Sequence, residues 1–540
     1  MEGVNTDKAP SAGVVVPHFI VAAIGFFLLS ILVFTSSNDF LGHFYQSRLL
    51  AITHLAALGW VTMIIFGALY QLIPVVFETA LYSERIAKIN LWFFLTGLVM
   101  MVVTFWTGGD TVWLIWSAII TFIALILFSI NVLLSIWGAA GRNYSSRFIA
   151  TAILWLLSTA IMGLLLALNR QYALFDASGW RLLKVHAHFG MIGWFLQLIM
   201  GIASVLVPMF LVSHDLKEKK LVFAYRLVNA GLILLVLGWL LRWGTQLLPL
   251  FSGIIILGVL FFLGYLRDAY RQKLRKFDIG MKLTTVALVA IFVPIVLGLW
   301  LSFQHLIGMS NNANASTLYG FTIFFAFITP LILGQTYKTL PFIIWLDRYQ
   351  PFIGKKKIPL PADLFSILIA EIHLWTYLAS VLFLSVGIMT TTPVLARLGA
   401  LFLVVTAILY LANVLKIVTH RKRVEDLATP KPNKGNDLLD LLKTVIDPEV
   451  EINIVDMGLI YKLDYDGDKK VDIEMTLSTP NCPIADSIVM NVMETILKKH
   501  PDYDVNVHLV FEPKWSPDKI SPEGKRLLKE GHKWKEKPKS

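Results

Sequence analysis

Three histidines lie inside apolar stretches long enough to cross a membrane: His54, His186 and His188. Ionisable side chains are rare in such stretches, because each is costly in hydrocarbon unless it is paired or hydrated. Neutral imidazole binds iron, copper and zinc, and two imidazoles on facing helices can hold a heme iron from both sides. The three histidines therefore predict a metal or heme site within the membrane.

His186 and His188 are two residues apart, so their side chains point about 200° apart on a helix of about 3.6 residues per turn. We expect them to face different neighbours, one a cofactor and the other a second group. The alternative is that each histidine only bonds a backbone carbonyl or lines a polar vestibule.

A pattern of small, aromatic and proline residues accompanies two of these histidines and recurs along the chain. The first copy is His54, Gly59, Trp60, Gly67 and Pro74; the second is His188, Gly193, Trp194, Gly201 and Pro208; the degraded third is Phe321, Phe327, Gly334 and Pro341. The copies start 134 and then 133 residues apart. An internal repeat of this length, four helices, predicts a bundle with approximate threefold symmetry in which Phe321 replaces the histidine of the third copy.

The composition places the chain in a lipid bilayer. It has 540 residues, 56% of them apolar, and twelve apolar runs of membrane-spanning length. They lie near 15–36, 48–76, 87–107, 110–138, 146–168, 184–212, 223–242, 246–268, 281–303, 316–346, 364–388 and 394–417. We therefore predict an all-α bundle of twelve helices over 15–420.

The ends of the chain differ from the bundle in composition. Residues 1–14 are expected to form a tail, 421–437 a charged linker, and 438–540 a small α/β domain. That domain should contain helices over 438–446, 485–500 and 523–530 and strands over 452–465, 471–476 and 505–511, the first two strands joined at Asp466-Gly467.

The basic residues predict the orientation. Loops after even-numbered helices hold 18 Lys and Arg residues, whereas loops after odd-numbered helices hold 6. By the positive-inside rule both termini are expected to be cytoplasmic, in the inner membrane of a bacterium. This bias and a basic tail account for the net charge of +11, so we expect no nucleic-acid partner.

Three further residues of the bundle could do chemistry. Glu371 and His373 lie within the eleventh span, and a carboxyl group beside an imidazole is a candidate proton relay. The alternative is a structural hydrogen bond to a neighbouring helix. His305 ends the ninth span at the expected level of the other histidines and is a weaker metal-ligand candidate.

The motifs FGALYQLIPVVFE (66–78) and VHAHFGMIGWF (185–195) resemble helices of the heme–copper oxidase and nitric-oxide reductase catalytic subunits. This resemblance implies twelve helices with threefold pseudosymmetry and metal centres in the outer third of the membrane. It implies that His54 is an axial heme ligand. The family has its His-x-His pair in the tenth helix and a three-histidine copper site, whereas here the pair is in the sixth and the seventh and eighth helices lack histidine. The resemblance thus leaves one heme b, with His54 and either His186 or His188 as axial ligands.

The C-terminal sequence resembles the small iron–sulfur-assembly domains of the SUF and phenylacetate-oxygenase maturation proteins. The matching residues are Asp447, Pro448, Glu449, Thr476, Thr479, Pro480, Cys482, Pro483, Trp515, Ser516 and Pro517. Cys482 is the single cysteine of the chain and is expected to be a thiolate at a helix start. One thiolate cannot hold a cluster, so the resemblance implies transient delivery of iron or an iron–sulfur cluster, a dimer through this domain, or a partner's ligands.

The sequence thus predicts a heme-binding, oxidase-like membrane protein with a cytoplasmic maturation domain, which supports the assembly of respiratory metalloproteins or electron transfer to them. Its expected partners are the lipid bilayer and respiratory or iron–sulfur-assembly proteins. Two alternatives remain at this stage. One is a terminal reductase of oxygen or nitric oxide, and the other is a transporter that uses the same fold.

Overall fold

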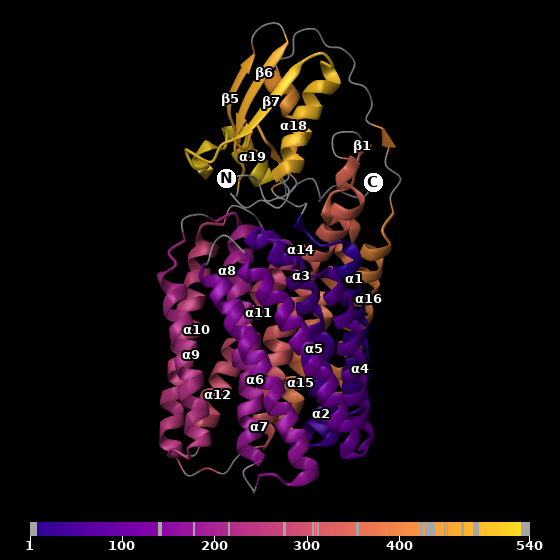
Figure 1. Cartoon of the computed structure of the whole chain (residues 1–540), viewed down its shortest axis with the longest axis vertical. Helices are drawn as coiled ribbons and strands as arrows, with labels where there is room; N and C mark the ends of the chain where they lie inside the picture. The colour runs from indigo at the N-terminus through magenta and orange to yellow at the C-terminus, as the bar shows by residue number, and fades with distance from the viewer. Residues whose placement is uncertain are drawn as a thin grey trace.

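The structure is a computed structural model that describes residues 8–138, 143–175, 179–213, 216–273, 277–304, 307, 309, 313–352, 356–421, 425–426, 438–447, 450, 452–465, 469–478 and 485–530. In this described part, twelve helical stretches are long and apolar enough to cross a membrane. They form one bundle, and a small α/β domain lies beyond one end of it (Figure 1). The predicted fold class is confirmed.

The first six spans are α1 (Ala12–Thr35), α2–η3–α3 (Ser47–His54, Leu55–Thr62, Met63–Phe77), α4 (Glu84–Thr107), α5 (Thr111–Trp137), α6 (Tyr144–Tyr172) and α7–η4–α8 (Gly179–His188, Phe189–Leu196, Gln197–Leu211). The last six are α9 (Lys219–Leu240), η5–α10 (Thr245–Leu247, Leu248–Arg271), α11–α12 (Ile279–Ala290, Phe292–Phe303), α13–η6–α14 (Ala313–Phe321, Thr322–Ile328, Thr329–Arg348), α15 (Ile367–Thr390) and α16 (Pro393–Thr419). Short 3₁₀ turns occur at η2 (Asp39–Leu41), η7 (Gln350–Phe352) and η8 (Pro361–Leu364).

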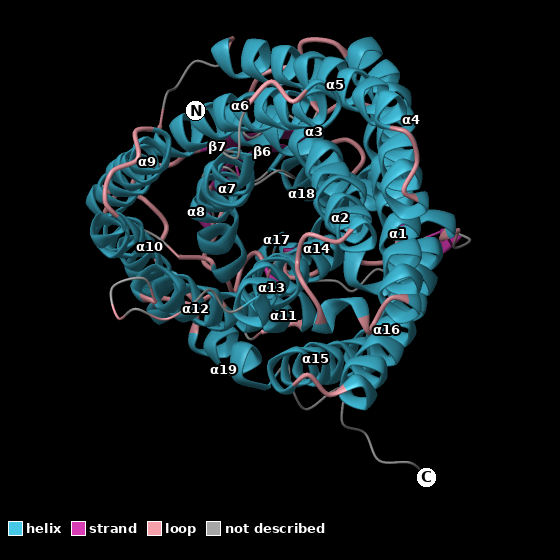
Figure 2. Cartoon of the chain, turned by 90° about the horizontal axis from the view of Figure 1, so that it is seen from below, coloured by secondary structure: helices cyan, strands magenta, loops and turns pink. Residues whose placement is uncertain are grey.

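The second, sixth and tenth spans are the centre of the bundle. Their most apolar stretches are 72%, 72% and 83% buried, more than those of any other described span. Figure 2 shows them inside a ring formed by the remaining helices. The bundle therefore has the arrangement that the internal repeat predicts, with one central helix from each repeat.

Each central span contains a π-helical segment at the same place in its repeat. The segments η3, η4 and η6 begin at Leu55, Phe189 and Thr322, directly after His54, His188 and Phe321. A π-helical turn inserts one residue into an α-helix and is frequent at functional sites. The insertion is thus a property of the repeat, since the third copy keeps it without the histidine.

Indole hydrogen bonds join the repeats around the central axis. Trp60 Nε1 donates to Thr329 Oγ1 over 3.1 Å, and Trp194 Nε1 donates to Thr62 Oγ1 over 3.5 Å. Thr62 and Thr329 occupy corresponding places in the first and third repeats. The third repeat has Phe327 where the others have the tryptophan donor, and the second repeat has Leu196 where the others have the threonine acceptor. An apolar pair thus replaces the third hydrogen bond.

The ends of the central helices nearest the C-terminal domain break the symmetry (Figure 1). α3 and α8 both end with a residue in the left-handed region, Glu78 at φ 50° and Val212 at φ 55°, whereas α14 continues to Arg348. At the chain start, α1 begins at Ala12, inside the stretch predicted as a tail. The backbone N–H and the hydroxyl of Ser11 both donate to Glu84 of α4, which fixes the start of α1 against the bundle.

The C-terminal domain has a three-stranded sheet of order β5-β6-β7 (Ile460–Tyr465, Lys470–Met475, Asp504–Leu509). β5 and β6 are antiparallel, and β6 and β7 are parallel and joined through α18 (Ala485–Lys499). The smaller elements are α17 (Leu438–Leu442), β3 (Ile446–Asp447), β4 (Ile452–Asn453), η9 (Pro517–Lys519) and α19 (Pro522–Glu530). Buried Val471, Ile473 and Met475 alternate along β6, which is typical of a sheet with one covered face.

The predicted strand over 452–465 is interrupted in the structure. Asn453 Oδ1 accepts from the Asp456 N–H and Asn453 Nδ2 donates to the Asp456 carboxylate, which closes a turn between β4 and β5. Gly458 follows at φ 67°, a conformation that favours glycine. Side-chain hydrogen bonds of Asn and Asp compete with strand pairing in this way, so the apolar residues alone did not indicate the break. The predicted turn at Asp466-Gly467 lies outside the described residues.

Two contacts connect the C-terminal domain and its linker with the segment that follows α14. Gln350 Nε2 donates to Ser487 Oγ, near the start of α18, over 3.0 Å. In addition β1 (Lys356–Lys357) pairs in antiparallel fashion with β2 (Glu425–Asp426) of the predicted linker. The longer third central helix is therefore the point at which the membrane part and the C-terminal part meet (Figure 1).

Candidate functional site

His54 is the last residue of α2, directly before the π-helical segment. Its Nδ1 donates to the Leu50 carbonyl over 2.7 Å, and its ring stacks on Phe105 of α4 with ring centres 5.0 Å apart. A carbonyl only accepts hydrogen bonds, so Nδ1 carries the proton and Nε2 keeps its lone pair. A metal ligand needs this arrangement, in which the second ring nitrogen is held by a neighbouring acceptor.

His186 has the same tautomer, but its partner is on another helix. Its Nδ1 donates to the Thr159 carbonyl of α6 over 2.9 Å. One turn further along α6, Gly163 lies beneath the ring, where a Cβ atom would be 3.0 Å from His186 Cε1. A backbone carbonyl of α6, the fifth span, thus orients the imidazole of His186 on α7, in the sixth span.

The imidazoles of His54 and His186 are neighbours in space. Their ring centres are 6.4 Å apart and their planes are inclined by 26°. Two metal–nitrogen bonds of about 2 Å each, with about 1 Å from each nitrogen to its ring centre, give about 6 Å for two imidazoles on one iron. The separation of the two ring centres therefore matches that of two imidazoles on one iron. We call this place, between α2 and α7, the first repeat interface.

His188 points away from this pair. Its Nδ1 donates to the Lys184 carbonyl over 2.8 Å, and its ring contacts Trp239 of α9 at 4.7 Å and Tyr319 of α13 at 6.2 Å. The two histidines of the motif therefore face different neighbours, as their spacing predicts. The sequence left His186 and His188 open as the partner of His54, and the geometry favours His186. The place between α7 and α13 is the second repeat interface.

The second repeat interface is a copy of the first with one residue type changed. His188 corresponds to His54, and Tyr319 lies 133 residues after His186. The ring planes of His188 and Tyr319 are inclined by 27°. A Cβ atom at Gly298 would lie 3.0 Å from Tyr319 Cε2, just as a Cβ atom at Gly163 would lie 3.0 Å from His186 Cε1. A phenol oxygen is about 3 Å from its ring centre, so a histidine and a tyrosine on one iron need about 8 Å. The 6.2 Å found here is too short for that sandwich.

The third repeat interface, where α13 meets the start of the first repeat, has no ligating side chain at the corresponding places. Phe321 replaces the first histidine and stacks on Phe325 with ring centres 4.9 Å apart, while Ile52 corresponds to His186. Both side chains are buried. The three interfaces thus offer two imidazoles, an imidazole with a phenol, and two hydrocarbon groups.

Glu371 and His373 are not brought together. Glu371 pairs with Lys282 of α11 over 2.6 Å, and both side chains are partly exposed. His373 is fully buried against the rings of Tyr337 and Tyr410, each 5.9 Å away, and neither ring nitrogen has a hydrogen-bond partner among the described residues. Two residues of separation place the side chains on different helix faces. The relay predicted from their proximity therefore lacks a direct contact.

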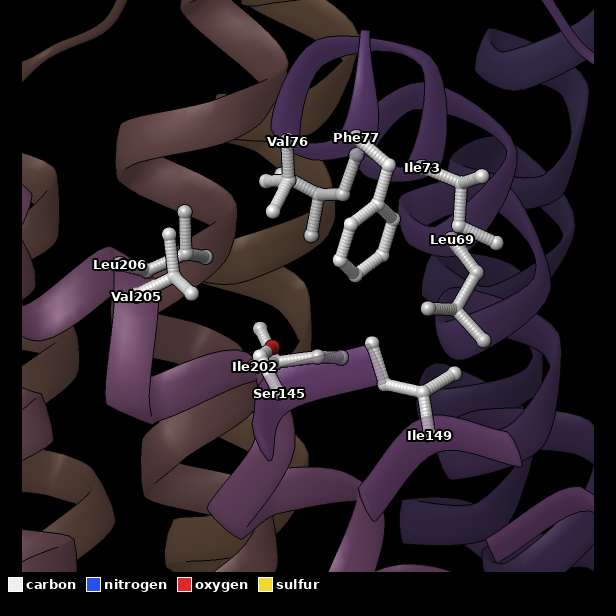
Figure 3. Close-up of a pocket in the computed structure, with 10 residues that line it drawn as sticks. Leu69, Ile73, Val76, Phe77, Ser145, Ile149, Ile202, Val205 and Leu206 are labelled. Carbon is white, nitrogen blue, oxygen red and sulfur yellow. The ribbon is translucent and has the colours of Figure 1, made fainter. Parts of the chain in front are cut away.

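Two cavities lie between the central helices, closer to the C-terminal domain than the histidines are. The smaller, about 10 Å³, has an almost entirely hydrocarbon lining from α3, α6 and α8, and its single hydroxyl, Ser145, is bonded to the Gly201 carbonyl (Figure 3). The larger, about 90 Å³, is lined by corresponding residues of all three repeats, such as Ile65, Ile199 and Ile332. Neither cavity contains a histidine, so the candidate heme ligands lie outside both.

In the C-terminal domain the structure describes other residues of the predicted motif, among them Asp447 and Trp515. Asp447 is buried and accepts from the Val450 N–H, and Trp515 donates to the Met457 carbonyl over 2.8 Å. Cys482 lies outside the described residues, as does His305 of the bundle. In the described part of the chain, no group of three or more His, Cys, Asp or Glu side chains is placed to hold a metal ion.

Asp456 joins the start of α19 to the turn before β5. Partial burial alone would raise its pKa, but hydrogen bonds from Ser521 and Asn453 and the charge of Lys443 together lower the pKa below its ordinary value. The ionised carboxylate therefore stabilises this corner of the domain at neutral pH.

Among the residues of the two histidine-bearing interfaces that sequence reasoning did not identify are Phe105, Thr159, Gly163 and Tyr319. Tyr319 could have been found, because it has the place of His186 in the third repeat. The other three are on outer helices, where nothing in their spacing indicated a contact with a histidine.

A search of solved structures shows the class of fold. The chain superposes on a subunit of a heme–copper terminal oxidase dimer with a TM-score of 0.57, at 11% identity and over 98% of this chain and 100% of that one. A segment of 107 residues, 19% of the chain, is 30% identical to the cbb3-type cytochrome c oxidase subunit CcoN1 of Stutzerimonas stutzeri and covers 22% of that protein. The bundle therefore has the heme–copper oxidase fold.

The C-terminal part of the chain shows which protein family the chain belongs to. Residues 436–509 match the family of the iron–sulfur cluster assembly protein. Over 87 residues, 16% of this chain and 83% of its relative, the chain is 41% identical to the Fe-S protein maturation auxiliary factor of Porphyromonas gingivalis. Through this domain the chain belongs to the iron–sulfur cluster assembly protein family, fused here to an oxidase-like membrane bundle.

Proposed function

We propose that the protein binds one heme b at the first repeat interface, with His54 and His186 as axial ligands. The observation that supports this most directly is the pair of neighbouring imidazoles, whose ring centres are 6.4 Å apart, a separation that matches two ligands on one iron. A bound heme supplies an iron that accepts and releases one electron. The function that follows is electron transfer in support of metalloprotein assembly.

The surrounding residues would prepare both ligands before a heme arrives. The carbonyls of Leu50 and Thr159 fix the tautomer, so each Nε2 has its lone pair directed away from its hydrogen-bonded nitrogen. Phe105 limits rotation of His54, and Gly163 leaves just enough space for His186. Contacts of this kind orient metal ligands, and their loss typically lowers the affinity for the metal about 10- to 100-fold.

A ligand set of two imidazoles argues against a terminal reductase. A heme held by both His54 and His186 would supply electron transfer, because neither side of its iron would be open to oxygen or nitric oxide. At the second repeat interface His188 and Tyr319 are too close to hold an iron from both sides, so we propose no second heme of this kind there. These observations favour electron transfer over reduction of a gas.

For the C-terminal domain we propose delivery of iron or an iron–sulfur cluster to respiratory proteins, with the Cys482 thiolate as the temporary ligand. The name of the relative, a maturation auxiliary factor, supports this role. A cluster needs more thiolates than one chain has, so the client or a second copy of the domain must supply them. The Lys and Arg bias supports a bacterial inner membrane with this domain in the cytoplasm.

The experiment is a hemin titration of the purified protein in detergent, followed by absorbance spectroscopy. We expect one heme per chain with a low-spin, bis-histidine spectrum that carbon monoxide does not change. His54→Ala and His186→Ala should each abolish this spectrum. His188→Ala is the matched control, because it removes an imidazole of the same helix that faces the second repeat interface.

Each other outcome contradicts the proposal in a distinct way. Loss of the spectrum in His188→Ala but not in His186→Ala would overturn the ligand assignment. A spectrum that responds to carbon monoxide would favour the terminal reductase. A protein that binds no heme would leave the transporter as the remaining reading of the fold.

A further inference from the structure

The three histidines differ in what holds the ring. His54 and His188 donate to the carbonyl four residues earlier on their own helix, at Leu50 and Lys184. His186 instead donates across to Thr159 on α6. The orientation of its imidazole therefore depends on where the fifth span lies relative to the sixth.

Gly163 is the second part of this contact. In α6 the Thr159 carbonyl is also the acceptor for the N–H of residue 163, since helical hydrogen bonds connect residues four apart. A Cβ atom at Gly163 would lie 3.0 Å from His186 Cε1, 3.4 Å from Nδ1 and 3.9 Å from Nε2. Any side chain there must push the ring by a few tenths of an ångström or turn it away from the carbonyl.

We propose that Gly163 is a positioning residue for the heme: its missing side chain, together with the Thr159 carbonyl, sets the angle at which His186 meets the iron. This inference rests on the proposed heme at the first repeat interface and extends it to a helix that supplies no ligand. Glycine is a poor helix former, so its presence in the middle of a membrane-spanning helix has a cost that close approach of the ring explains.

The second repeat interface provides a matched control. Gly298 lies beneath Tyr319 in the same way, with a Cβ atom 3.0 Å from Tyr319 Cε2. Gly298→Ala therefore makes the same steric change beside a ring that is not a proposed ligand. A third variant, Gly253→Ala, changes a glycine of α10 that has nothing within 4 Å of its Cβ position.

The test compares hemin binding and the electron paramagnetic resonance spectrum of the ferric heme in these variants. We expect Gly163→Ala to weaken hemin binding by about 10-fold, a usual loss of affinity when a group that orients a metal ligand is changed. The spectrum should also change, because the spacing of the ferric g values follows the angle between the two imidazole planes. Thermal stability should not fall, since alanine is the better helix former. Gly298→Ala and Gly253→Ala should bind hemin as the unmodified protein does.

Two results would overturn the inference. One is a Gly163→Ala protein with unchanged affinity and an unchanged spectrum, and the other is an equal loss in Gly298→Ala. A measurement without heme separates this failure from failure of the heme proposal. In protein with ¹⁵N-labelled histidine, the ring signals of His186, assigned by their loss in His186→Ala, should move in Gly163→Ala and stay in Gly298→Ala. If they stay in both variants, Gly163 does not position the ring, whether or not heme binds.

Discussion

The first and second repeat interfaces have nearly the same geometry and different chemistry. In each, a histidine at the end of a central α-helix faces a ring from the next repeat, with ring centres 6.4 and 6.2 Å apart and planes inclined by 26° and 27°. In each, a glycine of an outer helix lies beneath the second ring. The two interfaces differ in whether that second ring is an imidazole or a phenol.

This difference separates what the fold supplies from what a single residue supplies. The threefold repeat sets the depth, the separation and the inclination of two facing rings. Under the heme proposal, the residue type at one position then decides whether the pair can hold an iron from both sides. The third repeat interface, with Phe321 and Ile52, shows that the same bundle also closes around hydrocarbon groups.

The largest effect, on the heme content, should come from a substitution that makes the second repeat interface like the first. Tyr319→His places an imidazole opposite His188, at the place that His186 has in the first interface. We expect the heme content to rise from one to two per chain, measured as heme iron per protein after hemin titration. Tyr319→Phe is the control and should leave it at one. A folded Tyr319→His protein that still binds one heme would show that the matching geometry does not suffice.

A smaller effect should follow from breaking the indole contacts around the axis. Thr329→Val leaves the buried Trp60 N–H without its acceptor, which should cost about 2 kcal/mol of stability. Trp60→Phe combined with Thr329→Val removes both partners, as Phe327 and Leu196 do naturally, so the double variant should lose less than the sum of the single ones. Thermal unfolding in detergent measures both. Strict additivity would show that the hydrogen bond contributes nothing.

The smallest effect is expected outside the histidine-bearing interfaces, at Glu371. Its pair with Lys282 is partly exposed on both sides, and such pairs contribute about 1 kcal/mol or less. Glu371→Gln should therefore leave hemin affinity unchanged and thermal stability nearly so. A tenfold loss of hemin affinity would instead connect this carboxylate with the heme and restore the relay predicted from the sequence.

The sequence predicted the bundle well because its evidence is repeated many times. Twelve apolar runs and a pattern that recurs after 134 and 133 residues are enough to fix the number of spans and which of them are central. The spacing of His186 and His188 also predicted that they face different neighbours, because the direction of a side chain follows from the helical period.

The partners of those histidines could not be predicted in the same way. Contacts such as His186 with Thr159 depend on how two helices are rotated and shifted against each other, and residue spacing within one helix does not contain that information. The pairing of Glu371 with His373 failed for another reason: it was inferred from proximity in the sequence, whereas a two-residue spacing directs the side chains to different faces of the helix. In the C-terminal domain, the side-chain bonds of Asn453 and Asp456 ended a strand that the apolar pattern extended.

The strand pair β1–β2 shortens the tether of the C-terminal domain. Of the predicted linker, residues 425–426 are pinned beside the end of α14, so only residues 427–437 separate that anchor from α17. A segment of this length spans at most about 40 Å even when fully stretched. The C-terminal domain therefore stays within about 40 Å of this anchor, so its effective concentration is highest towards proteins that lie close to the same end of the bundle.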